Sequence, residues 1–273
     1  MVTIVLAVVL FAGAAAQDES ACLGFIDRSL LPMDVYVAGT EFEGLSTLAE
    51  QAELIYLNGP GLGSLRAGGT YLVVRPEGYV NHPWTKAPVG IYYRELGTIR
   101  IERTGPAAAA ALVMASCRPI MKGDRVIPMR EQPSVPVKAE SSDRLATAPE
   151  GALASAVVLG LDDRRELGAG DVCFIGVGTR DGVRPGDRFT VYRPQPPFSP
   201  QDLSVAGSEK ARTYRKVLSG LHRREVSNML RARSLPDRMM GDLVILRASE
   251  TTAVAKVVNS RAEIHIGDKA VRR

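Results

Sequence analysis

Short runs of apolar and β-branched residues, separated by glycine-containing turns, recur along the chain and predict β-strands rather than long helices. The clearest are "TYLVVR" (70–75), "TIRIER" (98–103), "RFTVYR" (188–193) and "DLVILR" (242–247). Their β-branched and aromatic residues suit a pleated, half-buried surface. Further strands are predicted at 33–38, 53–57, 152–160 and 171–175.

The chain also contains an internal repeat. Residues 53–76 align without gaps to residues 171–194, and residues 97–127 align in the same way to residues 241–271. Identical pairs include Arg75 with Arg193 and Arg103 with Arg247. Two ungapped blocks in the same order predict a duplication, with 26 extra residues between the blocks of the second copy.

The repeat decides how an alanine-rich segment is interpreted. On propensity alone, "AAAALVMAS" (108–116) would be predicted as a helix. Its partner, "TAVAKVVNS" (252–260), alternates and is β-branched. Because both copies should adopt the same fold, we predict a strand in both.

Small sheets with apolar faces close into barrels or sandwiches. We therefore predict a mainly β protein with two duplicated small β-barrel or SH3-like domains, at residues 17–129 and 151–273. The polar, proline-rich residues 130–150 between them indicate a flexible linker. The second domain carries a basic helical insert at about 200–238.

Glycine–aspartate pairs recur before the last strand of each copy. Catalytic carboxylates are one interpretation, but repetition at turn positions favours a turn role, in which glycine supplies a permissive backbone and aspartate caps the turn. The predicted structural turn residues are Gly68, Gly123, Asp124, Gly186, Asp187, Gly267 and Asp268.

The insert is a candidate contact surface. Its residues 208–233 have apolar side chains at three- and four-residue spacing, and the opposite face is basic. We take Arg215, Lys216, Arg223 and Arg224 as candidates for binding an anionic membrane surface or acidic polymer. The favoured alternative is a helix that covers one barrel end with its charges solvated.

The corresponding segment of the first copy, "EGYVNHPWTKAPVGIYYRE" (77–95), is rich in aromatic residues. His82, Trp84 and Tyr92 are candidates for lining a ligand groove, for example for a sugar ring. Packing on the barrel is the favoured alternative.

Catalytic chemistry finds little support in the sequence. The histidines His82, His222 and His265 have no metal-ligand spacing. The stretch "NGPGLGS" (58–64) resembles a phosphate loop, but a strand follows it where a phosphate loop requires a helix N-terminus. We expect a protein that is not an enzyme and that has no cofactor and no metal.

The three cysteines, Cys22, Cys117 and Cys173, are too few and too widely spaced for a disulfide framework or a zinc site. A bond between Cys117 and Cys173 in an oxidising compartment and buried free thiols are both open.

Residues 1–16 predict a signal peptide. Their apolar run is too short to span a membrane, and Ala14 and Ala16 fit a cleavage site before Gln17. We therefore expect export to the periplasm or cell envelope. The net charge of +4 permits contact with anionic surfaces, and no nucleic acid is expected as a partner.

Several stretches carry a family resemblance. The runs "GTYLVVRPEGYVNHP", "GIYYRELGTIRI" and "GDRVIP", with "DVCFIGVGTRDGVRPGDRFTVYRP" in the second copy, resemble a β-module of exported bacterial proteins that often accompanies LysM peptidoglycan-binding domains. The module is similar to the C-terminal domain of the flagellar assembly T protein. The resemblance implies a small β-barrel in the envelope with a binding or scaffolding role and no catalysis. The chain itself has no recognisable LysM segment.

We therefore expect a non-catalytic, exported binding or assembly module whose partner is an envelope protein complex, peptidoglycan or another anionic envelope polymer. The first alternative is a structural subunit of a flagellar or secretion-type envelope machine. The second is an enzyme that uses His82 and an aspartate on an envelope polymer.

Overall fold

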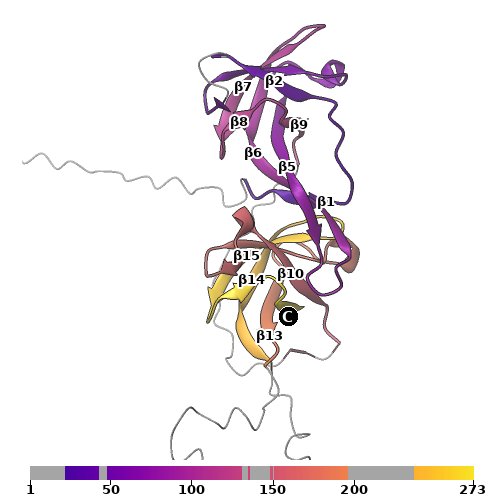
Figure 1. The fold of residues 1–273 in the computed structure, drawn as a ribbon, viewed down its shortest axis with the longest axis vertical. Helices are drawn as coiled ribbons and strands as arrows, with labels where there is room; N and C mark the ends of the chain where they lie inside the picture. The colour runs from indigo at the N-terminus through magenta and orange to yellow at the C-terminus, as the bar shows by residue number, and fades with distance from the viewer. Residues whose placement is uncertain (1–21, 43–47, 131–134, 136–147, 150, 196–236) are drawn as a thin grey trace, which may run out of the picture.

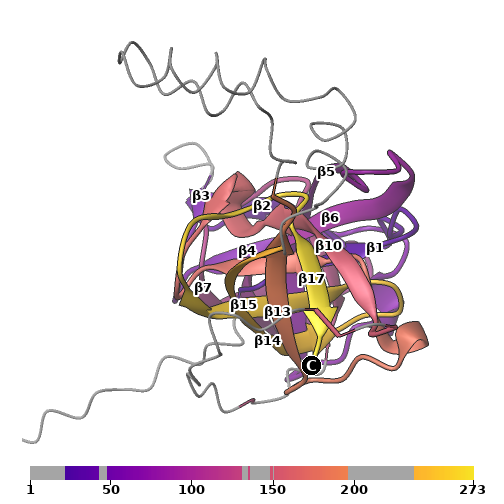
Figure 2. The same ribbon diagram turned by 90° about the horizontal axis from the view of Figure 1, so that it is seen from below.

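The computed structural model describes residues 22–42, 48–130, 135, 148–149, 151–195 and 237–273 (Figure 1). These residues form two β-barrels stacked along the long axis of the molecule, and the strands of the two barrels overlap when viewed along that axis (Figure 2). Helical structure within the described residues consists of three short 3-10 turns, η1 (Leu62–Ser64), η2 (Leu161–Asp163) and η3 (Thr179–Asp181). None of them has the length and apolar character needed to cross a membrane.

The N-terminal barrel is a seven-stranded sheet with the order β1-β6-β5-β9-β2-β4-β7, and an additional pairing between β6 and β7 joins six of its strands into a ring. Its seven strands are β1 (Phe25–Asp27), β2 (Tyr36–Thr40), β4 (Leu54–Asn58), β5 (Thr70–Asn81), β6 (Pro88–Thr104), β7 (Ala109–Ser116) and β9 (Arg125–Pro128). A separate two-stranded sheet pairs β3 (Leu48–Ala49) with β8 (Ile120–Met121).

The C-terminal barrel is closed, with the order β10-β12-β15-β14-β13-β17. Its six strands are β10 (Ala154–Gly160), β12 (Val172–Ile175), β13 (Arg188–Arg193), β14 (Arg238–Ala248), β15 (Ala253–Ser260) and β17 (Lys269–Arg272). A separate two-stranded sheet pairs β11 (Glu166–Leu167) with β16 (Ile264–His265). Read in the same direction, the ring of the N-terminal barrel is β2-β4-β7-β6-β5-β9. The aligned sequence segments therefore occupy equivalent places in two rings of the same strand order.

The predicted mainly β fold is confirmed, and so is the strand predicted for the alanine-rich segment, which is β7. Alternate residues of β7 are buried, beginning with Ala109, Ala111 and Val113 in the barrel core. Period-two alternation places every second side chain inside a barrel. This burial overrides the helix propensity of alanine.

Two predicted strands are much longer in the structure than in the sequence analysis. β5 and β6 continue past the barrel as a hairpin, whose residues 76–93 we call the arm (Figure 1). Register shifts occur at 76/78 and 80/81, and Gly78 and Gly90 take positive φ angles of 156° and 158°. These irregularities increase the local twist and redirect the hairpin, which reaches the C-terminal barrel.

Two predicted segments lie outside the described residues. One is the signal peptide at residues 1–16, and the other is the basic insert at about 200–238, of which only Asp237 and Arg238 are described. The helix predicted within that insert and the side chains of Arg215, Lys216, Arg223 and Arg224 therefore stay predictions. Most of the predicted linker at 130–150 lies outside as well.

Candidate functional site

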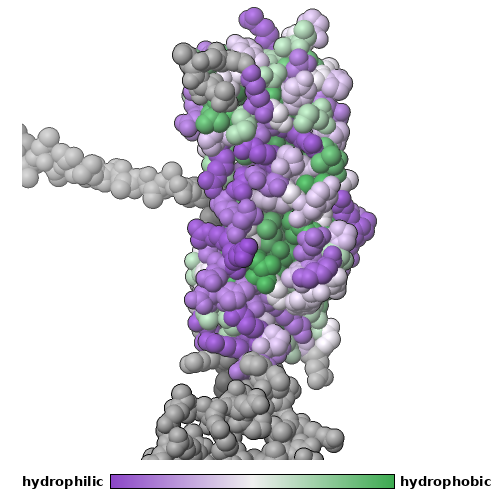
Figure 3. All heavy atoms as spheres, viewed as in Figure 1, coloured by the Kyte–Doolittle hydropathy of each residue, from purple (hydrophilic) through white to green (hydrophobic). Residues whose placement is uncertain are grey.

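The two barrels meet at an apolar junction. One cluster of buried residues combines Leu23, Ile26, Val80 and Tyr92 from the N-terminal barrel with Ala156, Val158, Phe174, Leu246 and Val254 from the C-terminal barrel. At its centre the rings of Tyr92 and Phe174 meet edge to face, with their centroids 5.3 Å apart. Figure 3 shows apolar side chains gathered on the C-terminal barrel beside the arm. Tyr92, a predicted groove residue, is 3% exposed and therefore packs in this junction.

A buried ion pair lies beside this cluster. Arg247 Nη2 lies 2.7 Å from Glu95 Oε1, and Arg247 also donates to the carbonyl of Gly24. Four buried polar atoms here, Tyr92 Oη, Glu95 Oε2 and Arg247 Nε and Nη1, have no hydrogen-bond partner among the described residues. Burial raises the pKa of the Tyr92 phenol, which therefore stays neutral. The desolvation of two buried charges offsets much of their Coulombic attraction. The pair therefore adds little net stability, and its main effect is to favour one docking geometry.

A second polar contact holds the outer edge of the junction. Asp162, in the η2 turn of the C-terminal barrel, pairs with both Arg94 and Arg118 of the N-terminal barrel. Asp162 and Asp163 both have φ angles of 57°, in the left-handed region that non-glycine residues seldom adopt. The two arginines therefore stabilise a turn that its own backbone disfavours.

The tip of the arm makes the third contact. Trp84 Nε1 donates to the carbonyl oxygen of Gly267 over 2.8 Å, although the Trp84 side chain is 52% exposed. His82 Nδ1 accepts from the backbone amides of Trp84 and Thr85, at 3.3 and 3.4 Å. The histidine proposed for chemistry therefore organises the turn at the arm tip. The described residues contain no group of three histidine, cysteine or acidic side chains that could hold a metal.

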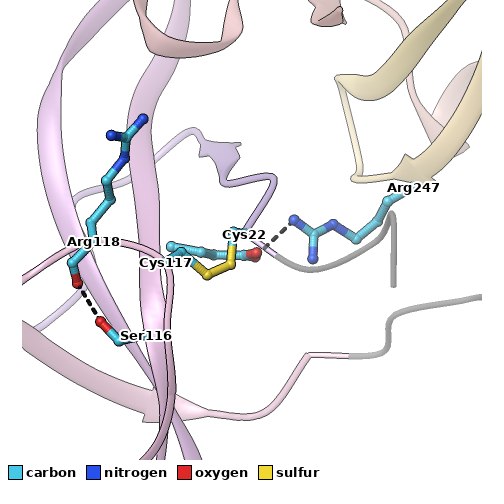
Figure 4. Close-up of a disulfide and its surroundings, with 6 residues drawn as sticks. Cys22, Ser116, Cys117, Arg118 and Arg247 are labelled. Atoms are coloured by element: carbon cyan, nitrogen blue, oxygen red, sulfur yellow. Dashed lines mark hydrogen bonds and ion pairs between the residues drawn. A yellow bond between two sulfur atoms is a disulfide. The ribbon is translucent and has the colours of Figure 1, made fainter. Parts of the chain in front are cut away.

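A disulfide anchors the N-terminal strand close to the junction. Cys22 and Cys117 are bonded, with Cα atoms 6.1 Å apart and a sequence separation of 95 positions (Figure 4). The possible bond between Cys117 and Cys173 is therefore wrong. Cys173 is a buried free thiol inside the C-terminal barrel, where burial raises its pKa to about 12. The sequence spacing contained no signal for the partner of Cys117, because the two cysteines become neighbours only in the folded sheet, where β1 and β7 both pair with β6.

A cleft of about 420 Å³ opens beside Arg247 at the junction. Its charged lining includes Asp27, Arg28, Arg130 and Glu250. Asp27 accepts from Arg130 at 3.3 Å, and Glu250 pairs with Arg180. Arg28 forms no ion pair with any described residue. The cleft is therefore lined by more cationic than anionic groups, with both acids already paired.

The glycine–aspartate turns have the same structure in both barrels. Asp124 accepts from Arg75 Nε and Nη2, both at 2.7 Å, and from the Met121 amide at 2.7 Å. Asp268 accepts from Arg193 Nε and Nη2 at 2.7 Å and from the His265 amide at 2.8 Å. The hydrogen bond to aspartate is the main cause that raises the pKa of Arg75 and of Arg193. We call each arginine–aspartate pair a clasp, since it joins a strand to the turn before the last strand.

The remaining predicted turn residues have matching geometry. Asp187 caps its turn by accepting from the Arg184 amide at 2.8 Å. Gly68, Gly123, Gly186 and Gly267 have φ angles of 77°, 87°, 91° and 98°. Positive φ angles of this size favour glycine, so these residues shape turns.

The structure thus places His82, Trp84 and Tyr92 on the arm, where Trp84 and Tyr92 contact the C-terminal barrel and His82 organises the turn at the tip. Sequence reasoning missed Glu95, Asp162 and Arg247, which complete that junction. Arg247 was visible only as the repeat partner of Arg103, and no sequence signal distinguished the buried arginine from the exposed one. Comparison of the chain with protein-family models and with curated proteins finds no match.

Proposed function

We propose that the chain is an exported, non-catalytic protein of the periplasm or cell envelope that acts as a binding and assembly module. The observation that carries this proposal is the docked junction. Its apolar cluster, buried ion pair and arm contacts hold two barrels in one elongated body. A large apolar interface between domains opposes relative motion, so surfaces of both barrels are presented to partners at a fixed spacing.

We infer a duplication as the origin of this architecture. The same ring order in both barrels and the same clasp between a strand and the turn before the last strand support it. Neither feature requires catalysis, since both serve to close a barrel.

The disulfide supports export. Bonds such as Cys22–Cys117 persist in oxidising compartments and are rare in the cytosol. Cys22 follows the predicted cleavage site after residue 16, so it would remain in the mature chain. The test is thiol alkylation of the protein in intact cells, followed by counting labelled cysteines with and without reductant. We expect Cys22 and Cys117 to label only after reduction; labelling of both without reductant would contradict export.

The candidate contact surface for an envelope partner is the basic segment with Arg215, Lys216, Arg223 and Arg224. Its test is charge reversal of all four residues, with arginine–lysine exchanges at the same positions as the matched control. We expect reversal to abolish co-sedimentation with the envelope and the control to retain it. Unchanged co-sedimentation after reversal would exclude the segment as the contact surface. Capture of envelope proteins without affinity for purified peptidoglycan would select the alternative role, a subunit of an envelope machine.

A further inference from the structure

The outer faces of the two barrels are equivalent in register but differ in what covers them. In the C-terminal barrel, Phe174 on β12 lies opposite Val254 on β15. In the N-terminal barrel, the aligned residues Tyr56 on β4 and Ala110 on β7 lie opposite each other in the same way. Phe174 and Val254 are buried under Tyr92 and Val80, from the arm of the N-terminal barrel.

The equivalent face of the N-terminal barrel has no such cover among the described residues. Along β2, β4 and β7, residues that point outward alternate with residues that point into the barrel core, and the outward residues are mostly apolar. We call this set, Tyr36, Leu54, Tyr56, Ala110, Leu112 and Met114, the open face. Tyr56 is 43% exposed and Met114 is 40% exposed. A contiguous apolar patch of this kind marks an interaction site.

The internal junction indicates what covers such a face. The arm leaves the N-terminal barrel where Arg75 pairs with Arg94, and it covers the next barrel along the axis. The equivalent exit in the C-terminal barrel is the pairing of Arg193 with Arg238, at the end away from the N-terminal barrel (Figure 1). Residues 196–236 leave the described structure at that exit. A barrel covered by a segment from that exit would therefore belong to another molecule.

Charge complementarity also favours contact between residues 196–236 and the open face. Residues 196–236 contain eight lysines and arginines against three acidic residues. One end of the open face is bordered by Glu41, Glu50 and Glu53, whose carboxylates form no ion pair with any described residue. Glu41 and Glu53 adjoin Leu54, because Glu41 Oε2 accepts from the Leu54 amide at 3.4 Å. Attraction between the basic segment and this acidic border would guide the contact and would weaken with salt.

We propose that the open face binds residues 196–236 of a second copy of this chain, so that molecules associate head to tail. This contact repeats between chains the arrangement that the arm makes within one chain. The contact is heterologous, since each copy offers one face and one segment. One end of an assembly therefore keeps a free face, and the other end keeps a free segment. The inference goes beyond the envelope role and does not require it.

The test uses two variants of the full chain and measures mass by sedimentation velocity. The face variant is Tyr56→Glu with Met114→Glu, and the segment variant replaces residues 197–235 with a short Gly-Ser linker. We expect the wild-type chain to associate with rising concentration and each variant alone to associate at least about tenfold more weakly. Mixing the two variants should produce a one-to-one complex that grows no further, because one supplies the segment and the other supplies the face.

The matched control is Tyr79→Glu, which places the same charge on an arm residue that is 81% exposed and lies outside the open face. It should associate as the wild-type chain does, and thermal unfolding should show that all variants fold. A chain that stays monomeric, association that survives both variants, or variants that do not complement each other would overturn the proposal. Cross-links between Tyr56 and residues 196–236 within a monomer would assign the face to the chain's own segment and would overturn it too. Because purified protein is used, failure here leaves the envelope experiments unaffected.

Discussion

Arg103 in the N-terminal barrel and Arg247 in the C-terminal barrel occupy the same position of the repeat but have opposite environments. Arg103 is exposed, whereas Arg247 is 7% exposed and pairs with Glu95. The difference arises because the arm and β1 of one barrel cover the other. Equivalent residues in a repeat therefore share a place in the barrel but differ in energetic role, and docking decides that role.

The largest expected effect is a difference in the free energy of unfolding between alanine variants of these two arginines. Arg247→Ala should lower the free energy of unfolding by about 3–5 kcal/mol, because it leaves the Glu95 carboxylate buried without its partner. Arg103→Ala should change it by less than about 0.5 kcal/mol. Denaturant unfolding measures both. Equal losses would show that the junction does not desolvate Arg247, and the double variant Glu95→Leu with Arg247→Met should regain much of the loss.

The disulfide sets the next difference, since it belongs to the N-terminal barrel alone. Cys22→Ser should cost about 2–4 kcal/mol because the bond closes a loop between residues 95 positions apart. Adding Cys117→Ser should cost little more, since a single bond is lost. Hydrogen exchange should accelerate at β1 and more weakly at β17. An additive double variant would mean that the two sulfurs stabilise the fold separately.

The clasps should show where the barrels are alike. Asp124→Asn and Asp268→Asn should each cost about 2 kcal/mol, since each removes a bidentate, charge-assisted contact with an arginine. Asp187→Asn should cost less because that carboxylate is 21% exposed, against 3% for Asp124. Denaturant unfolding of the three variants measures this order. A clasp that mattered in only one barrel would contradict the equivalence of the two rings.

The smallest effect is a dependence on alkaline pH that arises from Cys173, a buried thiol of the C-terminal barrel. Cys173 aligns with Ile55 of the N-terminal barrel, and burial raises its pKa to about 12. Because the unfolded chain loses this proton first, stability is full below the ordinary thiol pKa and falls between about pH 9 and pH 12. At about pH 10 the loss should be about 1 kcal/mol. Denaturant unfolding of the wild type and of Cys173→Val, at about pH 8 and at about pH 10, tests this. An equal loss of unfolding free energy in the variant would assign the effect to tyrosines such as Tyr92.

Much of each barrel could be predicted from its local pattern. Residues 70–75 and 188–193 alternate as strands must, and Gly123 and Gly267 stand where the backbone needs a positive φ angle. The repeat corrected the one segment where propensity pointed to a helix, residues 108–116. Strand lengths were predicted less well. The arm continues β5 and β6 through residues whose side chains pack on the other barrel, and the local pattern carries no signal of that packing.

The candidate site was predictable only in part. Trp84 and Tyr92 stood out as aromatic residues in a short segment, and both lie at the junction. Glu95, Asp162 and Arg247 did not stand out, because an isolated charged residue in a strand or turn reads as a solvated one. Their roles depend on contacts between residues far apart in the chain, as the pairing of Glu95 with Arg247 shows.

By itself, the sequence determined the strand pattern, the aligned repeat segments and the glycine–aspartate turns, since alternation and turn chemistry act within one barrel. Only the tertiary structure decided that Cys22 bonds Cys117, that Arg247 is buried while Arg103 is exposed, and that one of two equivalent faces is covered. The physical reason is that burial and desolvation depend on what packs against a surface. In this protein the covering segment comes from the other barrel.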